Sequence, residues 1–225
     1  MQNPDFVRKV FTSIAGRYDF ANHLLSGGLD FFWRNRVAKM VKQWNPALLL
    51  DLATGSGDLA LALQKKCPQT RVTGADFCHP MLLEAQRKGL GHLVTADGMA
   101  LPFADGTFDA VTVAFGLRNM ASWPVALREM GRVLKPGGHL LVLDFSMPDG
   151  WLRPLYRSYL HGALPWIAGC VTGDRGAYAY LGESIEKFPA GESMCSLIES
   201  QGFCEAQAFP MTMGIVSIYT ANVAK

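Results

Sequence analysis

The sequence has few charged residues, no run of basic side chains and no long apolar segment. Charged residues make up 18% of the chain, and the formal net charge is +2. This charge is too small for a protein that binds the phosphates of nucleic acid, so no nucleic-acid partner is expected. No apolar run approaches the ~18–20 residues that a helix needs to cross a bilayer.

Cysteine is also sparse. The five cysteines are odd in number and scattered, without a Cys-x-x-Cys pair, at Cys67, Cys78, Cys170, Cys195 and Cys204. This spacing predicts neither a disulfide framework nor a zinc site. The histidines show no ligand spacing either, so no metal is predicted. Residues 1–11 lack the apolar core of a signal peptide, and we expect a cytoplasmic protein.

Hydrophobic residues make up 49% of the chain, which suits a greasy substrate or a surface that lies against a membrane. The apolar segment 159–171 is interrupted by Gly162 and Pro165. It is long enough to touch a bilayer but too short to cross one. Peripheral contact with the inner face of the membrane therefore stays open as an expectation.

Elements of strand and helix type alternate along most of the chain. Strands are predicted at 47–52, 71–76, 92–96, 108–114, 139–145, 204–210 and 213–222. Helices are predicted at 4–25, 29–43, 57–66, 79–88, 122–134 and 191–202. The alternation predicts a doubly wound α/β sheet of parallel strands that ends in an antiparallel hairpin. We expect one domain over residues 1–225, with a helical cap at 1–43 and a mostly helical, aromatic-rich insertion at 147–190.

The most informative motif is the segment LLDLATGSGD at 49–58 together with a second acid, Asp76. An apolar strand that ends in Asp51 is followed by a glycine turn and a helix, an arrangement that brings backbone close to a small ligand. A carboxylate at the end of the next strand can accept hydrogen bonds from ribose hydroxyls. The motif predicts a pocket for a nucleoside cofactor.

The glycine pattern by itself leaves two cofactors open, because residues 55–60 also fit the dinucleotide fingerprint. Two details favour S-adenosylmethionine over NAD. The turn does not follow its strand directly, and the strand ends in an acid, which suits a sulfonium cation better than a pyrophosphate. Asp97 follows a further strand and can accept from an adenine amino group. The predicted cofactor-binding residues are Asp51, Gly55, Ser56, Gly57, Asp76, Phe77, Asp97, Gly98, Met99 and Ala114.

Beyond these motifs, the sequence resembles the ubiquinone/menaquinone biosynthesis C-methyltransferases over nearly its whole length. Five blocks carry the resemblance: YDFANHLLS at 18–26, LPF at 101–103, FGLRN at 115–119, RVLKPGG at 132–138 and YLGESI at 180–185. The resemblance implies a class I methyltransferase fold and methylation of a ring carbon on a polyprenylated quinol. The partner would be a lipophilic quinol, and a homodimer stays open.

The resemblance also implies site residues. A catalytic role is predicted for Arg118, Asn119, Tyr18 and Asp19, with Arg118 suited to stabilise a phenolate. Substrate contacts are predicted for His23, Phe115, Tyr159, Trp166 and Tyr180. The insertion then acts as a lid whose aromatic side chains line a channel for the prenyl tail. In the alternative interpretation these aromatic residues belong to the hydrophobic core and cover one face of the sheet.

The sequence departs from the family pattern at four positions. Asp30 stands where the family usually has His, Ala21 where it has Met, Asp144 where it has Glu, and Ser56 where Thr is common. Asp30 is expected near the mouth of the active site, where an anion in place of a ring puts the usual substrate in question. Three alternatives stay open: a methyltransferase for another apolar molecule such as a polyketide or sterol, a nicotinamide-dependent oxidoreductase, and a non-catalytic lipid-binding or scaffold module.

Overall fold

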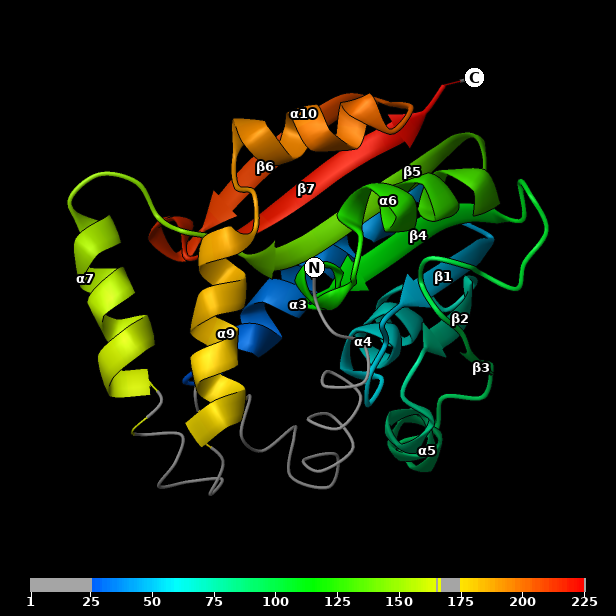
Figure 1. The fold of residues 1–225 in the computed structure, drawn as a ribbon. Helices are drawn as coiled ribbons and strands as arrows, with labels where there is room; N and C mark the ends of the chain where they lie inside the picture. Colours follow the sequence, from blue (N-terminus) through cyan, green and yellow to red (C-terminus); the bar gives the residue numbers. More distant parts are fainter. Residues whose placement is uncertain (1–25, 165, 167–174, 225) are drawn as a thin grey trace.

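The computed structural model describes residues 26–164, 166 and 175–224, and it has a central sheet with helices on both faces (Figure 1). The sheet has seven strands in the order β3-β2-β1-β4-β5-β7-β6. The strands are β1 Leu48–Leu52, β2 Arg71–Asp76, β3 Leu93–Thr95, β4 Phe108–Ala114, β5 Leu134–Phe145, β6 Phe203–Met211 and β7 Val216–Val223. The predicted α/β class and the antiparallel terminal hairpin are confirmed, since β7 pairs antiparallel with both β5 and β6.

From residue 29 onward the described helices follow the predicted order, and the helix predicted at 4–25 lies outside the described residues. They are α3 Leu29–Trp44, α4 Asp58–Lys66, α5 His79–Arg87, α6 Trp123–Val133, α7 Leu152–Ser158, α9 Arg175–Lys187 and α10 Glu192–Ser200. Short turns of other helix types lie at η2 Leu117–Asn119, η3 Tyr159–Ala163 and η4 Thr212–Gly214. No helix in the described part of the chain is long and apolar enough to cross a membrane.

Strand residues alternate between two cores because successive side chains in a strand point to opposite faces. On one face, Leu50 and Val111 pack with residues of α6 and α10 such as Met130 and Ile198. On the other, Leu49 and Leu141 pack with residues of α3 and α4. The near-continuous apolar strands reflect burial on both faces.

Strand β5 differs from its predicted start at residue 139. It begins at Leu134, which pairs with Phe108 of β4, and regular pairing resumes at His139 with Ala110. The segment Pro136-Gly137-Gly138 therefore forms an irregularity inside the strand rather than a turn before it. Gly137 has a φ of 74°, which suits glycine.

The described residues of the 147–190 segment are largely helical, in α7, η3 and α9. Their apolar side chains form a third, smaller cluster around Tyr156, Leu160, Leu164 and Ile185. Gly182 lets α9 approach η3 closely, since a Cβ there would lie 3.1 Å from the main-chain oxygen of Leu160. This part of the chain packs beside the carboxyl ends of the central strands (Figure 1).

Candidate active site

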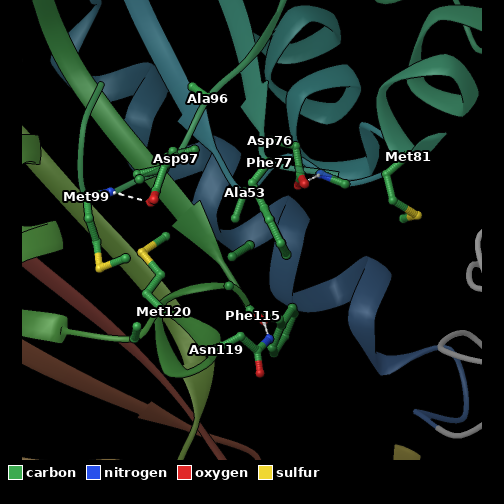
Figure 2. A pocket seen from close by; sticks show the side chains of 16 residues that line it. Ala53, Asp76, Phe77, Met81, Ala96, Asp97, Met99, Phe115, Asn119 and Met120 are labelled. Carbon is green, nitrogen blue, oxygen red and sulfur yellow. Dashed lines mark hydrogen bonds between the residues drawn. The ribbon is translucent and has the colours of Figure 1, made fainter. Parts of the chain in front are cut away.

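A pocket lies at the carboxyl edge of the parallel strands, where β1, β2 and β4 end (Figure 2). Its empty space is about 830 Å³ including the open mouth, within the ~300–1,000 Å³ of small-molecule sites. It is lined by Leu52, Ala53, Gly55, Asp76, Phe77, Met81, Ala96, Asp97, Gly98, Met99, Ala114, Phe115, Gly116, Asn119, Met120 and Ala121. Most of this lining is apolar, with two carboxylates.

Seven of the ten predicted cofactor residues line this pocket. They are Gly55, Asp76, Phe77, Asp97, Gly98, Met99 and Ala114. Asp51, Ser56 and Gly57 do not line it, and their contact with a cofactor stays a prediction. Ser56 is buried, and Gly57 begins α4.

Gly57 serves packing rather than ligand approach. A Cβ on Gly57 would lie 3.1 Å from the Cβ of Ala85 in α5, and its φ is 86°. The second glycine of the turn therefore lets the loop sit against α5, whereas Gly55 faces the pocket. The two glycines of this motif are thus favoured for two different physical reasons.

Asp51 is buried and does not line the pocket. In the parallel pairing of β1 and β4, Asp51 is the register partner of Thr112, so both side chains lie on one face. Its carboxylate accepts hydrogen bonds from Oγ1 of Thr54 at 2.6 Å and Oγ1 of Thr112 at 2.7 Å. Burial raises the pKa of Asp51 to about 6, although these two hydrogen bonds and the charge of Arg34 act in the opposite direction. Asp51 is therefore a buried anion behind the site, not a wall of it.

Asp76 ends β2 and faces the pocket. Its Oδ2 accepts from the main-chain N–H of Gly55 at 2.8 Å, and its Oδ1 accepts from that of Cys78 at 2.8 Å. Burial raises the pKa of Asp76, and these backbone donors partly counter the effect. A carboxylate has about four acceptor positions, so both oxygens can still accept from a pair of ligand hydroxyls.

Asp97 lies on the same side of the pocket as Asp76 (Figure 2). Its Oδ1 accepts from the main-chain N–H of Met99 at 2.9 Å, which closes a tight turn after β3. Gly98 lets the side chain of Met120 lie against this turn, since a Cβ would be 3.0 Å from its Sδ and Cε. The turn holds a carboxylate and the apolar side chains of Met99 and Met120 beside one another.

Two residues with left-handed backbone also line the pocket. Ala53 has a φ of 51° and Phe115 a φ of 56°, both unusual for residues with a Cβ. Gly116 lies between them, and a Cβ there would be 2.4 Å from the Cβ of Ala53. The sequence analysis missed Ala53 and Gly116. Their position in the sequence could have identified them. Ala53 directly follows the last residue of β1, and Gly116 is the second residue after β4.

Arg118, for which a phenolate-stabilising role is predicted, does not line the pocket. Its side chain is buried and its Nη1 donates to Oδ1 of Asp144 at 2.6 Å. The same nitrogen donates to the main-chain oxygen of Phe115 at 2.5 Å. The guanidinium also lies over the ring of Phe145, 5.3 Å from its centroid. This geometry supports a positioning role behind the wall.

Asn119 does reach the pocket. Its Nδ2 donates to the main-chain oxygen of Phe115 at 3.3 Å, so Arg118 and Asn119 both donate to one carbonyl. Its Oδ1 accepts from the hydroxyl of Tyr180 at 3.2 Å. Burial raises the pKa of Tyr180, which keeps that hydroxyl protonated at neutral pH. Tyr180 thereby links α9 to the pocket wall.

A sequence profile of the ubiE/COQ5 methyltransferase family matches residues 1–223. The chain belongs to this family. It is 45% identical over 219 residues to a protein of Thermus thermophilus named demethylmenaquinone methyltransferase, covering 95% of this chain and 99% of the relative. It is 40% identical to the ubiquinone/menaquinone biosynthesis C-methyltransferase UbiE of Paracoccus denitrificans, covering 95% of this chain and 89% of the relative.

Among solved structures, the fold matches human N-acetylserotonin methyltransferase in complex with SAM. The TM-score is 0.64 at 19% identity, over 96% of this chain and 59% of that one. The family and the fold make this chain a methyltransferase enzyme. The oxidoreductase and the non-catalytic module are thereby set aside.

Of the predicted substrate contacts in this methyltransferase, Phe115 alone among the described residues lines the pocket, and Tyr180 reaches it only through its hydrogen bond to Asn119. Phe115 lines the pocket and packs on Trp33 and Phe145, with ring centroids 6.0 and 4.8 Å away. Tyr159 and Trp166 do not line it: Tyr159 stacks on Tyr156, and Trp166 is exposed. Neither side chain lines this pocket, and their contact with a prenyl chain stays a prediction.

Tyr18, Asp19 and His23 lie outside the described residues, as does Ala21. Asp30 is described, and it does not open onto the pocket. It is buried at the start of α3, accepts from Oγ of Ser26 at 2.7 Å and pairs with Arg34. Arg34 in turn lies 3.5 Å from Asp58 and 6.0 Å from the ring centroid of Phe115. Where the family usually has a histidine, this protein therefore has an aspartate in a buried ion pair with Arg34.

Proposed function

We propose that this methyltransferase transfers a methyl group from S-adenosylmethionine to a ring carbon of a polyprenylated quinol. Demethylmenaquinol is the foremost substrate, and the benzoquinol of the ubiquinone pathway is the second. The observation that carries the proposal is the apolar pocket with Asp76 and Asp97 on one side, in a chain whose relatives are named demethylmenaquinone methyltransferase and UbiE.

The residues present fit the cofactor. Asp76 ends β2 with acceptor capacity left for two ribose hydroxyls. Asp97 and the turn at Gly98 and Met99 offer an acceptor and an apolar surface for an adenine ring. Gly116 leaves space that a Cβ would fill. The buried anion Asp51 lies behind this wall and favours a cationic ligand in front of it.

The chemistry needs an activated methyl group, a ring carbon in line with it and a phenol that loses its proton. When bound, S-adenosylmethionine supplies the methyl group as an electrophile. Asn119 and Tyr180 are the polar side chains that orient the quinol ring, and Phe115 supplies a flat apolar contact. Holding the two reactants in line can contribute several kcal/mol to the lowered barrier, up to roughly 7–11.

Water leaves such a site when the aromatic wall and the ligands close it. Electrostatic interactions with the charge of a phenolate are then stronger. Arg118 contributes a cation one layer behind Phe115, where Asp144 offsets most of its charge. Its contribution is therefore to fix the wall rather than to touch the ring oxygen. The ring proton leaves through water.

The direct test is methyl transfer to reduced, short-chain acceptors with S-adenosylmethionine labelled in its methyl group. A naphthoquinol that lacks the 2-methyl group, a matching benzoquinol and an apolar sterol are compared by single turnover. We expect labelled C-methyl product with the quinols, fastest with the naphthoquinol. Labelling of the sterol alone, or of an oxygen atom, would contradict the proposal.

A further inference from the structure

The helix formed by α7 and η3 has apolar side chains on two opposite sides. Its inner side carries Tyr156 and Leu160, which are buried against Phe145 and Ile185. Its outer side carries Trp151, Leu155 and Tyr159, spaced four residues apart and 71%, 59% and 37% exposed. A surface helix normally keeps one polar side toward water, so the apolar outer side requires a partner.

A turn that contacts the segment before α7 also carries an exposed apolar side chain. Met213 in η4 is 69% exposed. That turn lies against the segment that leads into α7, since Oγ of Ser146 donates to the main-chain oxygen of Gly214 at 2.7 Å. A Cβ on Gly214 would be 3.3 Å from Cα of Pro148. We call Trp151, Leu155, Tyr159 and Met213 the outer face; α7 lies at the periphery of the molecule (Figure 1).

Helix α7 carries basic side chains and no acidic ones, and the exposed Asp149 lies two residues before Trp151. Arg153 and Arg157 are exposed on α7, and the sequence has no Asp or Glu between Asp149 and Asp174. Glu186 of α9 accepts from Nε of Arg157 at 2.8 Å and lies 3.1 Å from Nε2 of His161. Arg153 has no ion pair with any residue that the structure describes. An apolar stripe of Trp, Leu and Tyr beside unbalanced arginine complements an anionic lipid surface.

The outer face is one helix layer away from the pocket. Inside it, η3 packs on α9 at Gly182, and α9 carries Tyr180 to its hydrogen bond with Asn119 in the pocket wall. We propose that the outer face docks on the anionic headgroup region of a bilayer. The inference deepens the proposed function and rests on it for its purpose, since a polyprenylated quinol resides in the bilayer. The docking itself requires no substrate.

The test is flotation of the full chain with vesicles that contain equal parts of phosphatidylglycerol and phosphatidylcholine, compared with phosphatidylcholine alone. We expect binding to the anionic vesicles that weakens when NaCl rises from about 0.05 to 0.5 M. The double variant Trp151→Gln/Leu155→Gln should lower the partition coefficient by about tenfold or more. Arg153→Gln should reduce it by a smaller factor and flatten the salt dependence.

Leu83→Gln is the matched control, because Leu83 is also an exposed leucine (40%) but lies on α5, away from the outer face. It should bind vesicles as the wild type does. Equal loss in this control, or no vesicle binding by the wild type, would overturn the proposal. So would sedimentation showing a dimer that the double variant breaks, since the outer face would then cover a second copy.

The two proposals fail separately. The double variant should methylate a short-chain, water-soluble quinol at the wild-type rate and lose rate only with a long-chain quinol held in vesicles. Wild-type protein that binds vesicles but transfers no methyl group to the soluble quinol would refute the proposed function and leave the docking surface. Full activity on both substrates by the double variant would refute the docking surface alone.

Discussion

The guanidinium of Arg118 and the carboxylate of Asp144 form a buried ion pair, 2.6 Å between Nη1 and Oδ1, directly behind the wall of the pocket. The same Nη1 donates to the carbonyl of Phe115, a residue with a φ of 56°. Asp144 also accepts from the main-chain N–H of Phe145 at 2.9 Å. The pair thus ties the end of β4 to the end of β5 and holds a strained main chain in place.

Arg118→Leu should lower both kcat and stability, because it leaves Asp144 buried without its cation. Loss of one partner of a buried pair costs about 3–5 kcal/mol. The double variant Arg118→Leu/Asp144→Leu should regain much of the stability but little of the activity, since the carbonyl of Phe115 still lacks its donor. Urea denaturation and single-turnover methyl transfer measure the two effects. Wild-type kcat in either variant would remove the pair from the mechanism.

Asp76→Ala should weaken S-adenosylmethionine binding by about 1.5–3 kcal/mol, the scale of hydrogen bonds to a charged group. Part of the loss comes from the loop, because Asp76 also accepts from Gly55 and Cys78. Isothermal titration calorimetry measures the affinity, with Asp105→Asn as an exposed control outside the pocket. An unchanged dissociation constant in Asp76→Ala would mean that the ribose lies elsewhere.

Asp51→Asn should change stability in a pH-dependent way. Burial raises the pKa of Asp51 to about 6 from 3.8, so the native state binds this proton more tightly than the unfolded state. The stabilising contribution of that proton is full below about pH 4 and is lost as the pH rises to about 6. As the pH rises from 4 to 7, the free energy of unfolding of the variant should therefore increase relative to that of the wild type, by up to about 3 kcal/mol.

The measurement for Asp51→Asn is urea denaturation of both proteins at several pH values, followed by calorimetry with S-adenosylmethionine at pH 7. The stability gain should come with weaker binding, because the buried anion that favours a cationic ligand is gone. A stability difference that is constant with pH would show that Asp51 titrates at the ordinary value.

Gly116→Ala should narrow the pocket, because its Cβ would lie 2.4 Å from the Cβ of Ala53. Overpacking of this kind costs about 1–3 kcal/mol. The double variant Ala53→Gly/Gly116→Ala should recover stability and cofactor affinity, since it removes the clashing Cβ and relieves a residue with a φ of 51°. Thermal unfolding and calorimetry follow both quantities. No rescue by the double variant would place the effect of Gly116 elsewhere.

Tyr180→Phe should raise the KM for the quinol or lower kcat by about tenfold, with cofactor affinity unchanged. The hydroxyl that it removes donates to Asn119 at 3.2 Å, and a neutral hydrogen bond contributes about 0.5–1.5 kcal/mol. Steady-state kinetics separate KM from kcat. Tyr159→Phe is the control, since that ring stacks on Tyr156, whereas the hydroxyl of Tyr180 donates to Asn119 in the pocket wall. Equal effects in both variants would point to the packing of the insertion instead.

Sequence alone determined the frame of this protein. The alternation of strands and helices fixes a parallel sheet, and parallel strands end at one edge, so Asp76 and Asp97 had to meet there. Apolar runs and glycine turns depend on neighbours within a few residues, which is why the strands, the described helices and most of the pocket wall could be predicted from the sequence.

Only the tertiary structure decided which way the strand-end side chains point. Asp51 and Asp76 both end apolar strands, yet register with Thr112 turns Asp51 behind the wall while Asp76 faces the pocket. Arg118 meets Asp144, 26 residues along the chain, and local sequence has no signal for that pairing. Likewise, Leu155 and Tyr156 are both apolar neighbours on one helix, and the packing of Phe145 and Ile185 buries the tyrosine and leaves the leucine to solvent. The reason is the same in each case: a side chain's partner is set by contacts between distant elements, and spacing along the chain does not encode them.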